Sequence, residues 1–267
     1  IWMADSEIAR NPEGWTIDFN KKPKWEYTHG LIMSSMQAVW KDKGEQRFYD
    51  YTKKFADFMI DSAGNILTYK KSDFNIDRVN GGKFLINLYE ESGEEKYRLA
   101  VEELRDQMRN HPRNSDVLDF LPTDHPKRND IIAIAQKLAK GIQRYQTPEG
   151  VWYQVVDQGT REGNYLESSA SGMFTYFLLK GAEKGYLDQD DLAAGKKAYE
   201  GMLVEFVRED ADGGVRLTNV CGVAGLGGNP YRDGSFEYYV GEEIRVNDPK
   251  GVGPFILASL QYEKLEK

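Results

Sequence analysis

Cysteine and histidine are scarce in this sequence of 267 residues, which has one cysteine and three histidines. A lone cysteine, Cys221, excludes an internal disulfide framework and a CxxC zinc site. His29, His111 and His125 form no HExxH or HxH pair. We therefore expect no histidine-rich metal site.

Long apolar runs and an excess of positive charge are also absent. No stretch of about 18 apolar residues occurs, so we expect no membrane partner and no membrane-spanning segment. The formal net charge of −8 argues against a nucleic-acid partner, because phosphate binding needs a basic surface. A hydrophobic content of 40% and a charged content of 29% are typical of a globular domain.

Apolar residues recur at helical spacing in four amphipathic segments. Each segment is expected to form a helix with one buried stripe. The stripes are Phe48, Tyr51, Phe55 and Phe58; Tyr97, Val101, Leu104 and Met108; Ile131, Ile134, Leu138, Ile142 and Tyr145; and Leu192, Tyr199, Met202 and Phe206. Strand signals are few, and residues 150–156 and 213–218 are expected to form short hairpins within loops.

Four further segments carry fewer charges and more small residues, and helices of this kind belong deeper in a protein. They begin at Gly30, Gly81, Ala170 and Gly251. The joints at 41–51 and 90–100 align with an offset of 49 residues. Inner helices that alternate with outer helices at this period predict an all-α fold of stacked helical hairpins, an (α/α)6 barrel.

The repeat is interrupted in residues 111–126, which read HPRNSDVLDFLPTDHP. Only the apolar stub Val117 to Leu121 stands where the period calls for roughly three helices, about 90 residues. We therefore expect residues 1–267 to form one barrel domain, interrupted near 115–117. Either the natural protein has further residues between Ser115 and Val117, or it is truly deleted, or it is a smaller protein with a tight turn.

The loops that lead into the inner helices meet at one mouth of such a ring, and they hold the candidate site residues. Asp77, in the segment NIDRVNGG, is either a helix N-cap or a site carboxylate oriented by Arg78 and the neighbouring asparagines. Trp25 and Tyr27 either present ring faces to a sugar or form a hydrophobic lid. His29 is expected to be a structural histidine rather than a base.

Two more groups of candidate residues lie in the second half of the chain. Glu167 and Ser168 begin an inner helix, where capping is the alternative to ligand binding. The glycine-rich residues 221–239 lack a GK[ST] motif, so a nucleotide site is excluded. We expect a long loop there, with Tyr231 and Arg232 available to contact a ligand.

Five segments together resemble a known family of hydrolases over nearly the whole chain. They read KWEYTHGLIMSSM, NIDRVNGGKFLINLYEESGEEKY, NHPR, GVWYQVVDQGTREGNYLESSASGMFTYFLLKG and AGLGGNPYRDGSFEYYVGEEIRVNDPKGVGPFILA. The sequence resembles the unsaturated rhamnogalacturonyl hydrolases of glycoside hydrolase family 105, which are related to the unsaturated glucuronyl hydrolases of family 88. The resemblance implies an (α/α)6 barrel and catalysis without a metal or organic cofactor.

The reaction that the resemblance implies is removal of a terminal 4,5-unsaturated uronic acid from lyase-generated oligosaccharides of the pectin or rhamnogalacturonan type. A carboxylic acid protonates the C4=C5 bond, water adds at C5, and the resulting hemiketal collapses to release the sugar. Asp77 matches the family's first active-site aspartate, which raises the pKa of the proton donor and holds the ring. Trp25 and Tyr27 match the aromatic pair beside the terminal sugar.

The proton donor of the family lies in a WxDG segment soon after the HPR sequence, and an arginine for the uronate lies in a later GRxxGW segment. Neither segment is present here. Two alternatives therefore stay open: an inert sugar-binding barrel that lacks its acid, and a conventional inverting glycosidase that uses Asp77 with Glu167.

The cellular compartment is expected to be the periplasm or the exterior, because such hydrolases accompany polysaccharide lyases, with the cytoplasm as the alternative. The chain begins at Ile1 with neither an initiator Met nor a signal-peptide pattern, so we expect a processed or trimmed form.

Overall fold

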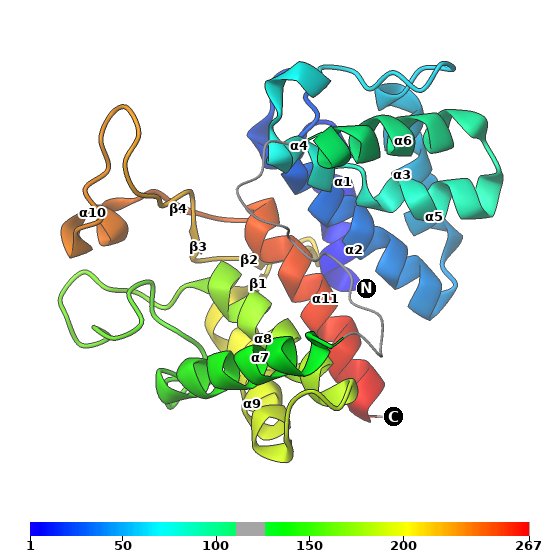
Figure 1. Cartoon of the computed structure of the whole chain (residues 1–267). Coiled ribbons are helices and arrows are strands. Elements are labelled where there is room, and N and C mark those ends of the chain that lie inside the picture. The colour runs from blue at the N-terminus through cyan, green and yellow to red at the C-terminus, as the bar shows by residue number, and fades with distance from the viewer. Residues whose placement is uncertain (111–125, 267) are drawn as a thin grey trace. The chain divides into compact units, whose positions relative to one another are not determined.

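The computed structural model describes residues 1–110 and 126–266, in two compact units (Figure 1). The N-terminal unit is Ile1–Val117 and the C-terminal unit is Leu118–Lys267. The interruption predicted near 115–117 and the stub Val117 to Leu121 lie outside the described residues. Across the two described ranges, no helix is long and apolar enough to cross a membrane.

The N-terminal unit is built of helical hairpins that follow one another along the chain. Its helices are α1 (Trp2–Arg10), α2 (Tyr27–Lys43), α3 (Gln46–Met59), α4 (Ile76–Asn80), α5 (Lys83–Ser92) and α6 (Glu95–Asn110), with 3-10 turns at Ile17–Phe19 and Lys71–Asp73. Helix α2 packs against α3, and α5 packs against α6 (Figure 1). The predicted inner segments at Gly30 and Gly81 are thus confirmed as the helices α2 and α5.

Both joints of the repeat end a helix in the same way. Gly44 (φ +71°) and Gly93 (φ +67°) are left-handed C-caps whose N–H groups donate to the carbonyls of Trp40 and Tyr89. Only glycine adopts this conformation without a steric penalty, so the chain reverses at equivalent points of each hairpin. This local geometry explains the alignment of the joints in the sequence.

The core of the N-terminal unit contains most of the predicted stripe of α3. Phe48 and Phe55 have no exposed surface, and Tyr51 is buried. The prediction for Phe58 is wrong, because its side chain is 50% exposed. Met59, four residues after Phe55, takes the buried position of the last turn instead.

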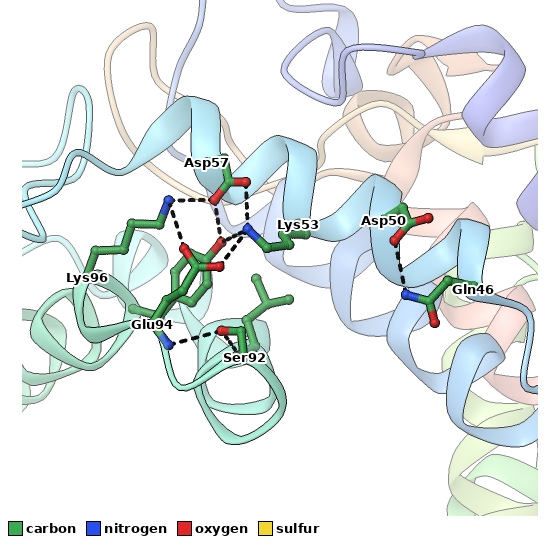
Figure 2. Close-up of polar contacts among 9 residues, drawn as sticks. Gln46, Asp50, Lys53, Asp57, Ser92, Glu94 and Lys96 are labelled. Atoms are coloured by element: carbon green, nitrogen blue, oxygen red, sulfur yellow. Dashed lines mark hydrogen bonds and ion pairs between the residues drawn. The ribbon is translucent and has the colours of Figure 1, made fainter.

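Four charged side chains and a tyrosine join α3 to the start of α6 (Figure 2). The Nζ of Lys53 lies 2.8 Å from the Oδ2 of Asp57 and 2.7 Å from the Oε1 of Glu94. The Nζ of Lys96 lies 2.6 Å from the Oδ1 of Asp57, and the hydroxyl of Tyr97 also donates to Asp57. Burial alone would raise the pKa of the Asp57 carboxyl, but the hydrogen bonds from Lys53, Lys96 and Tyr97 outweigh it and lower the pKa.

The described part of the C-terminal unit combines four long helices with short strands. Its elements are α7 (Arg128–Arg144), α8 (Ser168–Glu183), α9 (Gln189–Phe206), β1 (Val207–Glu209), β2 (Val215–Leu217), β3 (Val220–Cys221), α10 (Phe236–Gly241), β4 (Ile244–Arg245) and α11 (Pro249–Glu266). Helix α8 packs against both α9 and α11. The antiparallel pair β1–β2 places Val207 opposite Leu217, and β3–β4 places Val220 opposite Arg245.

The two expected loop hairpins have different outcomes. Residues 213–218 contain β2, so the prediction there is confirmed. Residues 150–156 form no hairpin, and one bridge joins Tyr153 to Leu166. The reason lies in Trp152, which is fully buried. Its backbone N–H donates to the Ser171 hydroxyl oxygen at 3.1 Å, and its indole N–H donates to the Ile142 carbonyl at 2.8 Å. These bonds tie the segment to helices rather than to a strand.

The predicted stripe of α7 is only partly buried. Ile142 is buried, but Ile131, Ile134 and Leu138 are 46%, 67% and 52% exposed, and Tyr145 is 37% exposed. The expectation of one buried stripe along α7 is therefore wrong for the described residues. Apolar residues at this spacing normally face a buried surface. Among the described residues, only the C-terminal end of α7 is packed in this way, where Ala139 and Ile142 lie in one cluster with Trp152.

Candidate active site

Asp77 lies on the short helical turn α4, and Asn75 is the N-cap of that turn. The side chain of Asn75 accepts a hydrogen bond of 2.9 Å from the backbone N–H of Asp77. The interpretation of Asp77 as a helix N-cap is therefore wrong, because Asn75 is the cap. The Asp77 carboxylate is exposed, and no group in the described ranges forms a hydrogen bond or ion pair with it.

Arg78 is held by its own unit. Its Nη1 donates to the Thr68 carbonyl at 2.9 Å, and its Nη2 lies 3.4 Å from the Oε1 of Glu26. With 19% of its side chain exposed, the guanidinium sits at the edge of the unit beside the Asp77 turn. Its cationic head is fixed in place, as recognition of a uronate carboxylate would need.

Trp25 belongs to the core of the N-terminal unit. Its ring has no exposed surface and lies 6.1 Å from both the Phe55 and the Phe84 rings, between centroids. Its indole N–H donates to the Arg78 carbonyl at 2.8 Å, and its backbone N–H donates to the Thr68 hydroxyl. Stacking of Trp25 on a sugar is not supported by this burial, since neither ring face is open.

Tyr27 and His29 follow on the first turn of α2 and differ in exposure. Tyr27 is partly exposed, so its contact with a sugar stays a prediction. His29 is fully buried, stacks on Phe55 at 5.1 Å between centroids, and places its Nε2 3.3 Å from the Trp15 carbonyl. Burial lowers the pKa of the imidazole below its ordinary value of 6.5. A neutral structural histidine fits these surroundings, and a contact with substrate does not.

In the C-terminal unit, Glu167 caps α8 with both carboxylate oxygens. Oε1 accepts from the Ser169 N–H at 3.0 Å and from the Cys221 N–H at 2.9 Å, and Oε2 accepts from the Ala170 N–H at 2.7 Å. The capping interpretation is confirmed. Because the Glu167 carboxylate is buried and accepts these backbone hydrogen bonds, the structure supports a capping role for it rather than that of the base in the inverting mechanism that pairs it with Asp77.

Ser168 and the glycine-rich loop complete the predicted set. Ser168 is buried, and its N–H donates to the Asn219 carbonyl at 2.9 Å. It is the first residue of α8, so a structural role fits these contacts. Arg232 folds back onto its own loop, where its Nε donates to the Gly227 carbonyl at 2.9 Å. Tyr231 is 76% exposed, so its contact with a ligand stays a prediction.

The predicted residues therefore form two groups. Trp25, Arg78 and the Asp77 turn are brought together in the N-terminal unit, and Glu167 and Ser168 lie together at the start of α8. A surface cavity of about 490 Å³ in the N-terminal unit lies elsewhere, between the turn at residues 63–65 and α6, and holds none of the predicted residues. The Asp77 carboxylate is exposed and has no partner within residues 1–110 and 126–266, which makes its turn the better candidate for chemistry.

Sequence reasoning named Asn75 as a neighbour that could orient Asp77, and its side chain does accept a hydrogen bond from the Asp77 N–H. It missed Thr68, whose carbonyl accepts from Arg78, because an isolated loop threonine carries no signal of its own. Gln107 did carry one, because it stands between Leu104 and Met108 on the apolar stripe of α6 and is fully buried. A buried polar residue needs hydrogen-bond partners, so a glutamine in an apolar stripe predicts that another segment of the chain hydrogen-bonds to α6 at this point.

Solved structures define the class of fold. A glycoside hydrolase from family 105 of C. acetobutylicum ATCC 824 matches with a TM-score of 0.90 and 32% identity, covering 98% of each chain. A glycosyl hydrolase of family 88 from Bacteroides vulgatus matches with a TM-score of 0.66 and 15% identity, covering 98% of this chain and 96% of the other. The all-α fold class of the (α/α)-barrel hydrolases is thereby confirmed.

The chain belongs to Glycosyl Hydrolase Family 88, whose sequence model matches residues 2–117 and 114–266. The two matched segments overlap at residues 114–117, where the sequence pattern predicts an interruption of the repeat. Among curated proteins, Protein Atu3128 of Agrobacterium fabrum and the 24.9 kDa protein in picA locus of Rhizobium radiobacter are each 40% identical over 149 residues. That stretch is 54% of this chain, and the chain spans 64% of the length of each relative.

Proposed function

We propose that the protein is a glycoside hydrolase that removes a terminal 4,5-unsaturated uronic acid from lyase-generated oligosaccharides. The observation that carries this proposal is the Asp77 carboxylate, exposed and without a hydrogen-bond partner in the described ranges, on a turn capped by Asn75. Membership of a glycoside hydrolase family supplies the class of reaction. Pectin or rhamnogalacturonan fragments are the proposed source of the substrate, and the periplasm or the exterior is the proposed compartment.

The proposed reaction begins with protonation of C4 of the vinyl ether by a carboxylic acid. Water then adds at C5, and the resulting hemiketal opens the ring to a C5 ketone and a hemiacetal at C1. The hemiacetal collapses to an aldehyde and releases the partner sugar as an alcohol. In this reaction Asp77 lies beside the unsaturated sugar ring. Its negative charge raises the pKa of the carboxylic acid that donates the proton, so that this acid stays protonated near neutral pH, and its oxygens accept hydrogen bonds from sugar hydroxyls. Arg78, fixed by Thr68 and Glu26, adds positive charge for the uronate carboxylate.

The assay follows the ultraviolet absorbance of the conjugated double bond, which disappears as the unsaturated ring opens. We expect Asp77→Asn to lower turnover by about 10² or more, the usual loss for an acid–base partner. Asp73→Asn is the matched control, because Asp73 is an exposed aspartate of the same loop, and it should keep wild-type turnover. Wild-type turnover in Asp77→Asn would remove the assignment.

An inert sugar-binding protein is the second candidate, favoured by the absence of a WxDG segment after HPR. It predicts saturable binding of the unsaturated disaccharide, measured by calorimetry, with no loss of absorbance. The intact mass of the natural protein separates the two candidates. A mass near 30.5 kDa favours the inert protein, and a mass of roughly 40 kDa favours the enzyme, since about 90 further residues complete the hairpin repeat.

A further inference from the structure

Gln107 is a buried polar residue of α6 whose side chain bridges two points of the loop before α4. Its side chain has no exposed surface. Its Nε2 donates to the Asn75 carbonyl at 3.0 Å, and its Oε1 accepts from the Tyr69 hydroxyl at 2.6 Å. Both ends of the amide are thus satisfied, and the amide has one orientation that fits both partners.

The partner Asn75 is also the residue that begins the Asp77 turn. Its side-chain oxygen accepts from the Asp77 N–H at 2.9 Å, while its carbonyl takes the hydrogen bond from Gln107. A cap residue fixes the direction in which the following turn leaves it. Gln107 therefore acts on Asp77 through Asn75, which lies 32 residues before Gln107 in the sequence.

The far end of the turn is fixed separately. The Trp25 indole donates to the Arg78 carbonyl at 2.8 Å, and a Cβ on Gly81 would lie 2.8 Å from the same indole nitrogen. This end is anchored by close packing in the core. At the start of the turn, the Asn75 carbonyl also accepts from the Arg78 N–H at 3.3 Å, a bond within the turn itself. The Gln107 amide donates the hydrogen bond that ties this carbonyl to α6, so its removal loosens that end while the packed end stays in place.

We propose that Gln107 is a positioning residue that holds the Asp77 carboxylate in the orientation used in the reaction. The inference rests on the proposed function of Asp77. The competing explanation is that Gln107 adds only to the stability of the hairpin between α5 and α6. The two explanations differ in what they predict for turnover per folded molecule and for coupling to Asp77.

The test compares three single variants of the natural protein. Gln107→Met keeps the length of the side chain and removes both hydrogen bonds, and Tyr69→Phe removes only the hydroxyl that orients the amide. Lys71→Met is the matched control, since its Nζ binds Glu103 and Asp106 of the same helix through exposed ion pairs that contribute little. Thermal unfolding monitors the folded fraction of each variant.

Two measurements are made on each variant. The first is kcat and KM for the unsaturated disaccharide, alone and combined with Asp77→Asn. We expect Gln107→Met to lower kcat about 10-fold or more per folded molecule, as for a displaced catalytic group, with a smaller loss in Tyr69→Phe and none in Lys71→Met. In the Asp77→Asn background, Gln107→Met should cause no further loss.

The second measurement is amide hydrogen exchange in residues 75–82, which does not depend on activity. Gln107→Met should raise exchange there about 10-fold, the effect of one lost hydrogen bond, and leave exchange in α3 unchanged. Unchanged exchange in residues 75–82 overturns the inference, as does wild-type kcat in Gln107→Met or a further loss in the double variant. If Asp77→Asn keeps wild-type turnover, the proposed function fails instead, and hydrogen exchange alone decides whether Gln107 holds the turn.

Discussion

Gly30→Ala tests how closely the Asp77 turn is packed against α2. A Cβ on Gly30 would lie 2.4 Å from the Asn80 carbonyl oxygen and 2.7 Å from the Gly81 Cα. Both atoms belong to the backbone, so no change of rotamer relieves the contact. Replacing a helical glycine by alanine normally gains about 1 kcal/mol, whereas overpacking of this kind costs about 1–3 kcal/mol. Because a contact of 2.4 Å with the backbone puts the cost near the upper end of that range, we expect a net loss of about 2 kcal/mol in the free energy of unfolding.

The control for this substitution is Gly141→Ala on α7, where a Cβ would meet nothing within 4 Å. Here the gain in helix propensity is unopposed, so the variant should be more stable by about 0.5–1 kcal/mol. Thermal unfolding followed by circular dichroism should show a lower midpoint for Gly30→Ala and a higher one for Gly141→Ala, by about 2–4 °C per kcal/mol. If Gly30→Ala unfolds at the wild-type temperature or above it, the close approach of Asn80 to α2 is refuted.

Two further predictions concern burial and charge. Ile134→Ala should change the free energy of unfolding by less than about 0.5 kcal/mol because the side chain is 67% exposed, whereas Ile142→Ala should cost about 2–4 kcal/mol because Ile142 is buried. An equal, large cost in urea denaturation would show that something covers Ile134. Asp57→Asn should destabilise the protein at neutral pH by less than about 1 kcal/mol, since the ion pairs with Lys53 and Lys96 are partly exposed. The folded pKa of Asp57 is lowered, so its contribution is present above the unfolded pKa and is lost as the pH falls through the folded pKa. The difference from wild type in unfolding free energy should therefore shrink in acid, and a difference that grows in acid would contradict the ion pairing.

The long helices could be predicted from the sequence because their determinants are local. Apolar spacing identified α3, α6, α7 and α9, and small-residue segments identified α2, α5, α8 and α11. Left-handed glycines at positions 44 and 93 end α2 and α5, the first helices of successive hairpins, which is why the repeat is visible in the sequence. The short turn α4 was not predicted, because its five residues carry no periodic pattern.

The candidate site was predicted in part. Asp77 was identified from the segment NIDRVN, and its exposed carboxylate keeps it the leading candidate. The roles of its neighbours depended on contacts that no local pattern contains. Asn75 rather than Asp77 is the cap, and Trp25 reaches the Arg78 carbonyl across 53 residues of sequence.

The sequence by itself determined the all-α class, the alternation of helices and the family of the chain, since these depend on short-range spacing and on motifs. Only the tertiary structure decided which side chains are covered. Trp25, predicted to contact a sugar or to form a lid, is fully buried, and Ile134, predicted to lie in a buried stripe, is 67% exposed. Burial depends on which distant segment packs against a residue, and for Gln107 that segment lies 32 residues away. The spacing of apolar residues shows which face of a helix is suited to burial, and the tertiary structure decides whether another segment packs against that face.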